Sequence, residues 1–167
     1  MVLLFSNRKN KLEKEIIEIL TACGAEFISD KFITASGGYF TVAVCYKKTL
    51  ININKGVALM LDDTHRFLKQ EFPIGITGIC EDSNETALKL FKANGLPVIT
   101  CGNNAKNTLT ISSVENNNYL VTLQREIIDI KGNVICPADY KICLEKAYSP
   151  EAVMLSCGVL CLIGAKF

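Results

Sequence analysis

Residues 74–102 alternate between apolar and amphipathic runs in an order that few folds accommodate. Residues 74–80 are mostly apolar, residues 84–94 place apolar side chains at helical spacing, and residues 97–100 are apolar again. A buried strand, a helix and a second buried strand form a β-α-β unit with parallel strands and a right-handed crossover. Because a parallel sheet needs helices on both faces, we expect an α/β fold.

The start of the chain repeats this alternation. Residues 2–6 are apolar, and residues 10–23 follow with a helical pattern that ends at Gly24, so a strand and a helix are predicted there. The apolar run at residues 57–61 predicts another buried strand, and a short helix is expected over residues 65–72.

Two other β-rich runs, residues 26–34 and 39–46, flank Gly37 and Gly38. Strands joined by a glycine pair are typical of a hairpin, so we expect these two strands to be antiparallel. Residues 49–54 place two isoleucines on one face and are predicted to form one more strand.

The pattern changes in the last third of the chain, where short alternating runs separated by turns predict antiparallel strands. Ser149 and Pro150 then mark a helix start. The helix that follows is apolar on nearly all sides, so it is either buried or pairs with another subunit. We predict one domain with a three-layer, Rossmann-like fold and a mostly parallel sheet with helices on both faces. Its parts are α/β units in residues 1–107, an antiparallel β extension in 108–144 and a C-terminal apolar helix in 149–167.

Composition narrows the function classes. A length of 167 residues is typical of one domain, and 49% apolar against 21% charged residues indicates a globular protein. Lys plus Arg total 18 and Asp plus Glu 17, without a large block of one sign, which argues against nucleic-acid binding and a polybasic membrane surface. The sequence shows neither a signal peptide nor an apolar run of membrane-spanning length. We therefore expect a cytoplasmic protein without membrane insertion.

Eight cysteines occur, none in a Cys-x-x-Cys pair, and His65 is the single histidine. This set does not suit a zinc site, and no cofactor is predicted. Without an export signal, such thiols are typically reduced core residues. Cys80 and Cys101 are weak candidates for a reactive thiol, because both end predicted strands and Cys80 precedes a helix start. The neighbouring Glu81 and Asp82 oppose thiolate formation.

Open α/β sheets bind ligands beyond the carboxyl ends of their strands, and three polar loops are expected to meet at that edge. One loop leads into a helix N-terminus, which favours anions, although Glu81 and Asp82 already place negative charge there. Helix capping is the alternative explanation for these residues. The residues expected to line a site for a small, anionic ligand are Ser6, Asn7, Arg8, Glu81, Asp82, Gly102, Asn103, Asn104 and Lys106.

No complete catalytic or phosphate-binding motif is present in the sequence. Gly75 and Gly78 are not followed by the rest of a P-loop, and neither G-x-G-x-x-G nor G-x-S-x-G occurs. Two acidic pairs, at residues 62–63 and 81–82, stand at predicted helix starts, where capping explains them. A divalent cation would fit there only if the two loops meet in space.

Two segments resemble the central domain of the Mur ligases. Residues 78–84 (GICEDSN) resemble the family's N-A-D-D-P-N loop, and residues 97–102 (PVITCG) resemble its V-I-T-F-G motif. The resemblance lies within residues 56–123 and implies a nucleotide-binding-like α/β scaffold. The family's ATP-binding G-T-N-G-K-T loop has no counterpart, and the asparagine that opens the first motif falls on Ile79, so ATP-driven ligation is not implied.

The chain also resembles a family of small α/β proteins from low-GC Gram-positive bacteria, through residues 6–10, 78–82 and 101–102, and that family implies no particular function. We therefore predict a non-catalytic binding or assembly module on a degenerate Mur-ligase-like scaffold, with a homo-oligomer formed through the C-terminal helix. Two alternatives stay open. One is a small-ligand (nucleotide or nucleotide-sugar) binding protein or enzyme with its site at the carboxyl edge of the sheet, and the other is a thiol-dependent enzyme or redox sensor.

Overall fold

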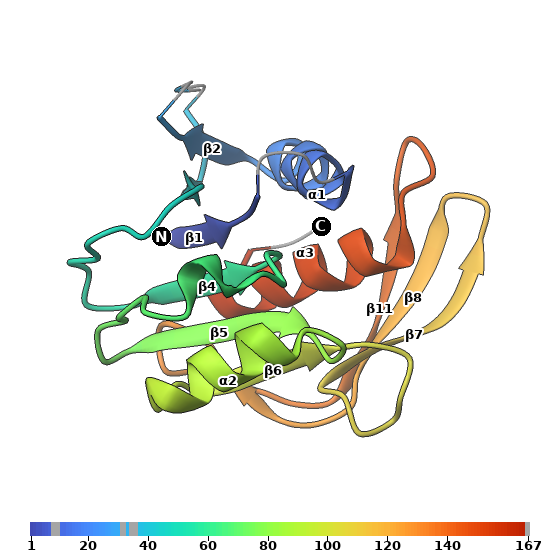
Figure 1. Cartoon of the computed structure of the whole chain (residues 1–167). Helices are drawn as coiled ribbons and strands as arrows, with labels where there is room; N and C mark the ends of the chain where they lie inside the picture. Colours follow the sequence, from blue (N-terminus) through green and yellow to red (C-terminus); the bar gives the residue numbers. More distant parts are fainter. Residues whose placement is uncertain (8–10, 31–32, 34–36, 166–167) are drawn as a thin grey trace.

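The computed structural model describes residues 1–7, 11–30, 33 and 37–165. Its centre is a nine-stranded sheet in the order β11-β8-β7-β6-β5-β4-β1-β3-β2 (Figure 1). The parallel strands are β1 (Val2–Phe5), β2 (Ala25–Ile28), β3 (Phe40–Cys45), β4 (Gly56–Met60), β5 (Ile76–Glu81), β6 (Val98–Cys101) and β7 (Leu109–Glu115). The antiparallel strands β8 (Asn118–Leu123) and β11 (Ala138–Cys143) extend the sheet beyond β7. This confirms the predicted α/β class and its antiparallel extension.

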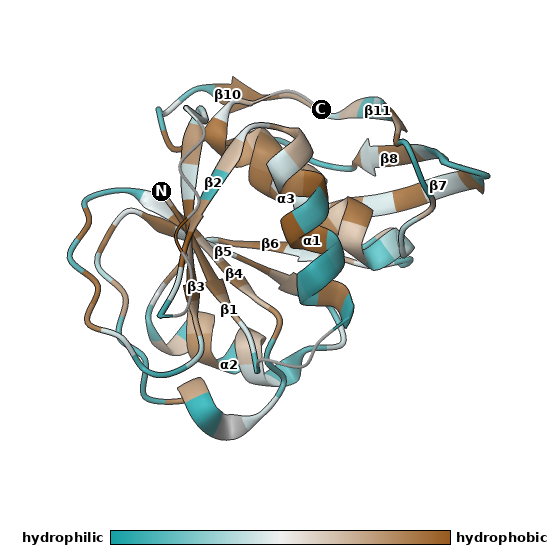
Figure 2. Cartoon of the chain, turned by 90° about the horizontal axis from the view of Figure 1, so that it is seen from above, coloured by the Kyte–Doolittle hydropathy of each residue, from teal (hydrophilic) through white to brown (hydrophobic). Residues whose placement is uncertain are grey.

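Helices cover both faces of the sheet. On one face lie α1 (Lys11–Ala22) and α3 (Pro150–Ile163), and on the other lie α2 (Glu85–Ala93) and the 3₁₀ turn η1 (His65–Phe67) (Figure 2). Successive strand residues point to opposite faces, so β4 places Val57 and Leu59 in the core under α1 and α3. Ala58 and Met60 enter the core under α2. A strand buried on both faces must be apolar at every position, as β4 is.

The C-terminal helix α3 lies in the core. Ser149 caps it, accepting a hydrogen bond from the Ala152 N–H at 3.4 Å, Pro150 occupies its first turn, and Gly164 ends it with a φ of 70°. All of its residues from 152 to 163 are buried against α1 and strands β4 to β8. Figure 2 shows α3 as mostly apolar, whereas α1 carries polar residues on its outer side. Packing within one chain therefore accounts for the apolar sequence of α3.

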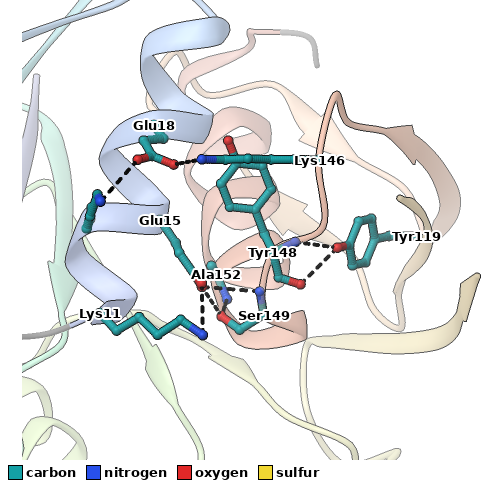
Figure 3. Close-up of polar contacts among 9 residues, drawn as sticks. Lys11, Glu15, Glu18, Tyr119, Lys146, Tyr148, Ser149 and Ala152 are labelled. Carbon is teal, nitrogen blue, oxygen red and sulfur yellow. Dashed lines mark hydrogen bonds and ion pairs between the residues drawn. The ribbon is translucent and has the colours of Figure 1, made fainter. Parts of the chain in front are cut away.

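A set of polar contacts joins α1, the start of α3 and the β extension (Figure 3). The Glu15 carboxylate on α1 accepts hydrogen bonds from the Ser149 N–H, at 3.1 Å, and from the Ser149 hydroxyl. The Tyr119 hydroxyl on β8 accepts from the Tyr148 N–H at 2.7 Å and donates to the Tyr148 carbonyl at 2.8 Å. These bonds fix the segment that leads from the extension back into α3.

The predicted hairpin is wrong, because β2 and β3 pair in parallel, with Ala25 opposite Phe40. The backbone N–H groups of Gly37 and Gly38 both donate to Glu26 Oε1 at 2.9 Å. The glycine pair therefore lies beside the beginning of β2 rather than beyond its end. The chain returns to that end of the sheet before β3 starts, which makes the two strands parallel.

The strand predicted at residues 49–54 is also absent from the structure, which describes that segment fully. The Gln70 side chain binds both backbone groups of Thr49, with its oxygen 2.9 Å from the Thr49 nitrogen and its nitrogen 2.8 Å from the Thr49 oxygen. A side chain thus takes the backbone bonds that a neighbouring strand would supply. Within the described part of the chain, no helix is both long enough and apolar enough to cross a membrane.

Candidate functional site

A cleft of about 600 Å³ opens where the strand order of the sheet reverses. From β1 the chain runs through α1 to β2 and β3 on one side, and then crosses to β4 on the other. Where the connections from two adjacent parallel strands run to opposite sides, a crevice forms between their loops at the carboxyl ends of the strands. The residues that line it are Asn7, Leu12, Met60, Leu61, Asp63, Thr64, Arg66, Glu81, Ser83 and Asn84.

The loop after β4 and the loop after β5 meet at this cleft. Asn84 Nδ2 donates to the Asp62 carbonyl at 3.2 Å, and Thr86 Oγ1 donates to the Asp63 carbonyl at 2.9 Å. Asn84 Oδ1 also accepts from the Ala87 N–H at 2.9 Å and so caps α2. One asparagine therefore both starts a helix and holds the neighbouring loop in place.

Glu81, the last residue of β5, is a partly buried carboxylate of the cleft. Partial burial raises the pKa of this carboxyl group, and the negative charges of Glu151, Asp82 and Asp63 raise it further. A hydrogen bond from Ser83 Oγ to Glu81 Oε2, at 3.3 Å, opposes the shift. Carboxylates with raised pKa values in clefts are common at functional sites.

Asp62 is buried beneath the cleft. Its Oδ1 accepts from the Thr64 N–H at 2.6 Å, whereas its Oδ2 has no hydrogen-bond partner among the described residues. Arg66 Nε lies 3.9 Å from that oxygen, and Arg66 Nη1 donates to the Tyr46 carbonyl at 3.4 Å. The arginine thus lies between the buried carboxylate and the cleft, with 45% of its side chain exposed.

The structure divides the predicted site residues into groups. Asn7 and Glu81 line the cleft, and Arg8 lies outside the described residues. Ser6 is fully buried at the end of β1, where its N–H donates to the Cys45 carbonyl at 3.2 Å and its hydroxyl has no partner among the described residues.

Asp82 and the loop after β6 form a second cluster beside the cleft. Asn107 Nδ2 donates to Asp82 Oδ2 at 2.7 Å. A Cβ on Gly102 would come within 2.6 Å of both of these side chains, so the glycine permits their close approach. Asn103, Asn104 and Lys106 are exposed on the same loop and are not among the cleft-lining residues.

The two candidate thiols are buried. Burial raises the pKa of Cys80 to about 12, with further contributions from the charges of Glu81 and Asp82. Burial also raises the pKa of Cys101 well above its usual value. Neither arrangement favours a thiolate at neutral pH, which nucleophilic thiol chemistry requires.

Eight of the ten cleft residues were absent from the predicted set, among them the polar residues Asp63, Thr64 and Arg66, which follow β4. Helix capping is a sufficient local explanation for the acidic pair at residues 62–63, and the approach of this pair to the β5 loop depends on tertiary structure. Although the two acidic loops meet, the described residues contain no group of three or more His, Cys, Asp or Glu side chains placed to hold a metal ion.

The arrangement can bind donors of hydrogen bonds. Asp63 and Glu81 offer acceptor oxygens, Asn7, Thr64 and Ser83 add neutral polar groups, and apolar side chains form part of the wall.

Comparisons of the sequence with models of protein families and with curated proteins found no match.

Proposed function

We propose that this chain is a binding module whose cleft takes a small, neutral, hydroxyl-rich molecule such as a sugar or a nucleoside. The observation that carries the proposal is the position of Glu81, a partly buried carboxylate of raised pKa in a cleft shared with Asp63. Each hydroxyl that donates to Glu81 would replace hydrogen bonds that burial has removed from this carboxylate.

The charge of the cleft favours a neutral ligand over a polyphosphate. Asp63, Glu81 and the nearby Glu151 would repel phosphate groups, and the charge of Arg66 is shared with the buried Asp62. The resemblance to the Mur ligases stays a hypothesis about the origin of the scaffold, and it adds no phosphate-binding loop to this cleft.

The apolar part of the cleft lining can pack against the apolar face of a ligand ring. Leu12, Met60 and Leu61 contribute apolar surface, and most of the polar groups come from the loops after β4 and β5. Ligand sites commonly combine an apolar wall with a few fixed polar groups that orient the ligand. A sugar or nucleoside has both an apolar ring face and hydroxyl groups, so it matches both kinds of lining residue.

Isothermal titration calorimetry against panels of neutral monosaccharides and nucleosides tests the proposal, with nucleoside triphosphates and Mg²⁺ as the contrasting panel. We expect binding from the neutral panels, lost in Glu81→Gln and Asp63→Asn. The matched control is Glu115→Gln, which neutralises an exposed carboxylate at the end of β7 and should leave binding unchanged. Absence of binding to both neutral panels, or equal loss in the control, would refute the proposal.

A further inference from the structure

The sheet ends on one side at β11, and the described residues supply no strand beyond it. Ala138, Asp139, Lys141 and Cys143 of this strand are exposed. An unpaired edge presents a row of backbone N–H and C=O groups that another strand can bind. The edge is five residues or more in length, which is typical of a complete strand.

The hydrogen bonds between β11 and β8 determine which residues face outward. The Leu144 N–H donates to the Asn117 carbonyl at 3.0 Å, and this pair continues the register in which Cys143 lies opposite Asn118. Hydrogen-bonded pairs alternate with non-hydrogen-bonded pairs in an antiparallel ladder. The even-numbered residues of β11 therefore bond to β8, whereas Asp139, Lys141 and Cys143 direct their backbone groups to the open edge.

We propose that β11 pairs with β11 of a second copy of this chain, antiparallel and about a two-fold axis at Tyr140. In this register Asp139 lies opposite Lys141 of the partner subunit, and Lys141 opposite Asp139 of the partner subunit. Both pairs consist of outward-bonding residues, so each can exchange two backbone hydrogen bonds. The two protomers would share one continuous sheet.

Charge selects this register over its neighbours. Outward-bonding residues of one copy must lie opposite outward-bonding residues of the other. The two-fold axis must therefore pass through a residue of β11, and neighbouring registers place it one residue earlier or later. An axis at residue 139 places two aspartates opposite one another, and an axis at residue 141 places two lysines opposite one another. Opposite charges directly across a ladder stabilise the pair and like charges destabilise it.

The monomer already orients one of these side chains. Thr122 Oγ1 on β8 donates to Asp139 Oδ1 at 2.7 Å, which holds the carboxylate on the exposed face of the sheet. Lys141 lies two residues further along the same strand and therefore points to that same face. The edge is thus complementary to itself, and its occupant is a second copy rather than an unrelated strand. The homo-oligomer predicted through the C-terminal helix would instead form through β11.

Sedimentation velocity of the full chain in reductant, over a concentration series, tests the proposal. We expect a monomer–dimer equilibrium that Lys141→Glu weakens on the order of tenfold or more, because two opposite-charge pairs become like-charge pairs. The exchange variant Asp139→Lys/Lys141→Asp restores both opposite-charge pairs and should recover the dimer. Thermal melting of each variant verifies that the monomer is folded.

A cross-linking variant tests the register independently. Tyr140→Cys places two thiols across the axis in a non-hydrogen-bonded pair, about 4.5 Å apart between Cα atoms. The background carries Cys136→Ser and Cys143→Ser, and also Cys157→Ala and Cys161→Ala, because these two thiols lie beside Tyr140 and could trap the new cysteine within one chain. A disulfide spans this separation, so oxidation should yield a covalent dimer. A chain that is monomeric at every concentration, a dimer unaffected by Lys141→Glu, or no recovery in the exchange variant would overturn the proposal.

Discussion

The contact between Glu15 and Ser149 should contribute more to stability than any exposed ion pair on α1. The Glu15 side chain is only 12% exposed, and it accepts hydrogen bonds from both the backbone N–H and the hydroxyl of Ser149. Hydrogen bonds to a charged group contribute about 1.5–3 kcal/mol each, and they are not fully additive. We therefore expect Glu15→Ala to lower the free energy of unfolding by about 2–4 kcal/mol.

Thermal unfolding followed by circular dichroism measures this loss. For a domain of this size, 1 kcal/mol corresponds to a shift of about 2–4 °C, so the Tm should fall by roughly 4–16 °C. The matched control is Glu18→Ala, one turn further along α1. Glu18 pairs with Lys146 at 2.7 Å and with Lys14 at 4.0 Å, but water screens these surface pairs, so the loss should be clearly smaller.

The pH dependence of the free energy of unfolding distinguishes the contribution of the Glu15 charge from that of its side-chain packing. Burial alone would raise the pKa of Glu15, but the two hydrogen bonds from Ser149 and the charge of Lys11 outweigh it, so the pKa is lowered. A lowered pKa stabilises the fold above the unfolded-state pKa, and that stabilisation is lost as the pH falls through the folded-state value. The difference between wild type and Glu15→Gln should therefore disappear in acid. Equal losses in Glu15→Ala and Glu18→Ala at neutral pH would refute the reasoning.

Three further predictions concern the core, the thiols and the cleft. Gly78→Ala should destabilise the chain by about 1–3 kcal/mol in urea unfolding, because its Cβ would come within 2.6 Å of the buried Phe91 ring. Cys136 and Cys143, the two exposed thiols, should react with an aromatic disulfide reagent in the native protein, and the fully buried thiols only after denaturation. Glu81→Gln should raise the Tm at pH 8, because the raised pKa of Glu81 means that its charged form opposes folding; the gain should vanish at pH values below its unfolded-state pKa.

The sequence was sufficient to predict those helices and strands whose ends and buried faces are marked by residues close together in the chain. Ser149, Pro150 and the apolar run after them mark α3 at both ends, and the spacing in residues 84–94 locates α2. Such elements depend on capping groups and on which residues must be buried. The sheet order of the β-α-β unit follows as well, because a helix between two buried strands leaves few alternatives.

The errors arose where a long-range contact replaced a local one. Nothing near Gly37 and Gly38 in the sequence indicates that their N–H groups bind Glu26, a contact that places them at the start of β2, as parallel pairing of β2 and β3 requires. Likewise Thr49 satisfies its backbone through Gln70, 21 residues away in the chain. A pattern of apolar residues cannot distinguish a strand from a segment whose backbone bonds are supplied by a distant side chain.

The sequence predicted which edge of the sheet carries the candidate site, but not all of the residues that line it. The rule that ligands bind at the carboxyl ends of parallel strands led to Asn7 and Glu81. The contribution of Asp63 and Arg66 depends on the bond from Asn84 to the Asp62 carbonyl, which joins two loops. Each loop has an adequate local explanation as a helix cap, so the sequence gives no reason to bring them together.

Binding and assembly should be separable in this chain, because they lie in different parts of one sheet. Three strands stand between β11 and β5, the nearest strand that lines the cleft, which places the proposed dimer edge about 19 Å from the cleft at the usual strand spacing. Substitutions so far apart, without shared partners, normally act independently. Lys141→Glu should therefore weaken the dimer without changing ligand affinity, and Glu81→Gln should abolish ligand binding without changing the dimer. Loss of both properties in either variant would mean that the cleft is completed by the second copy.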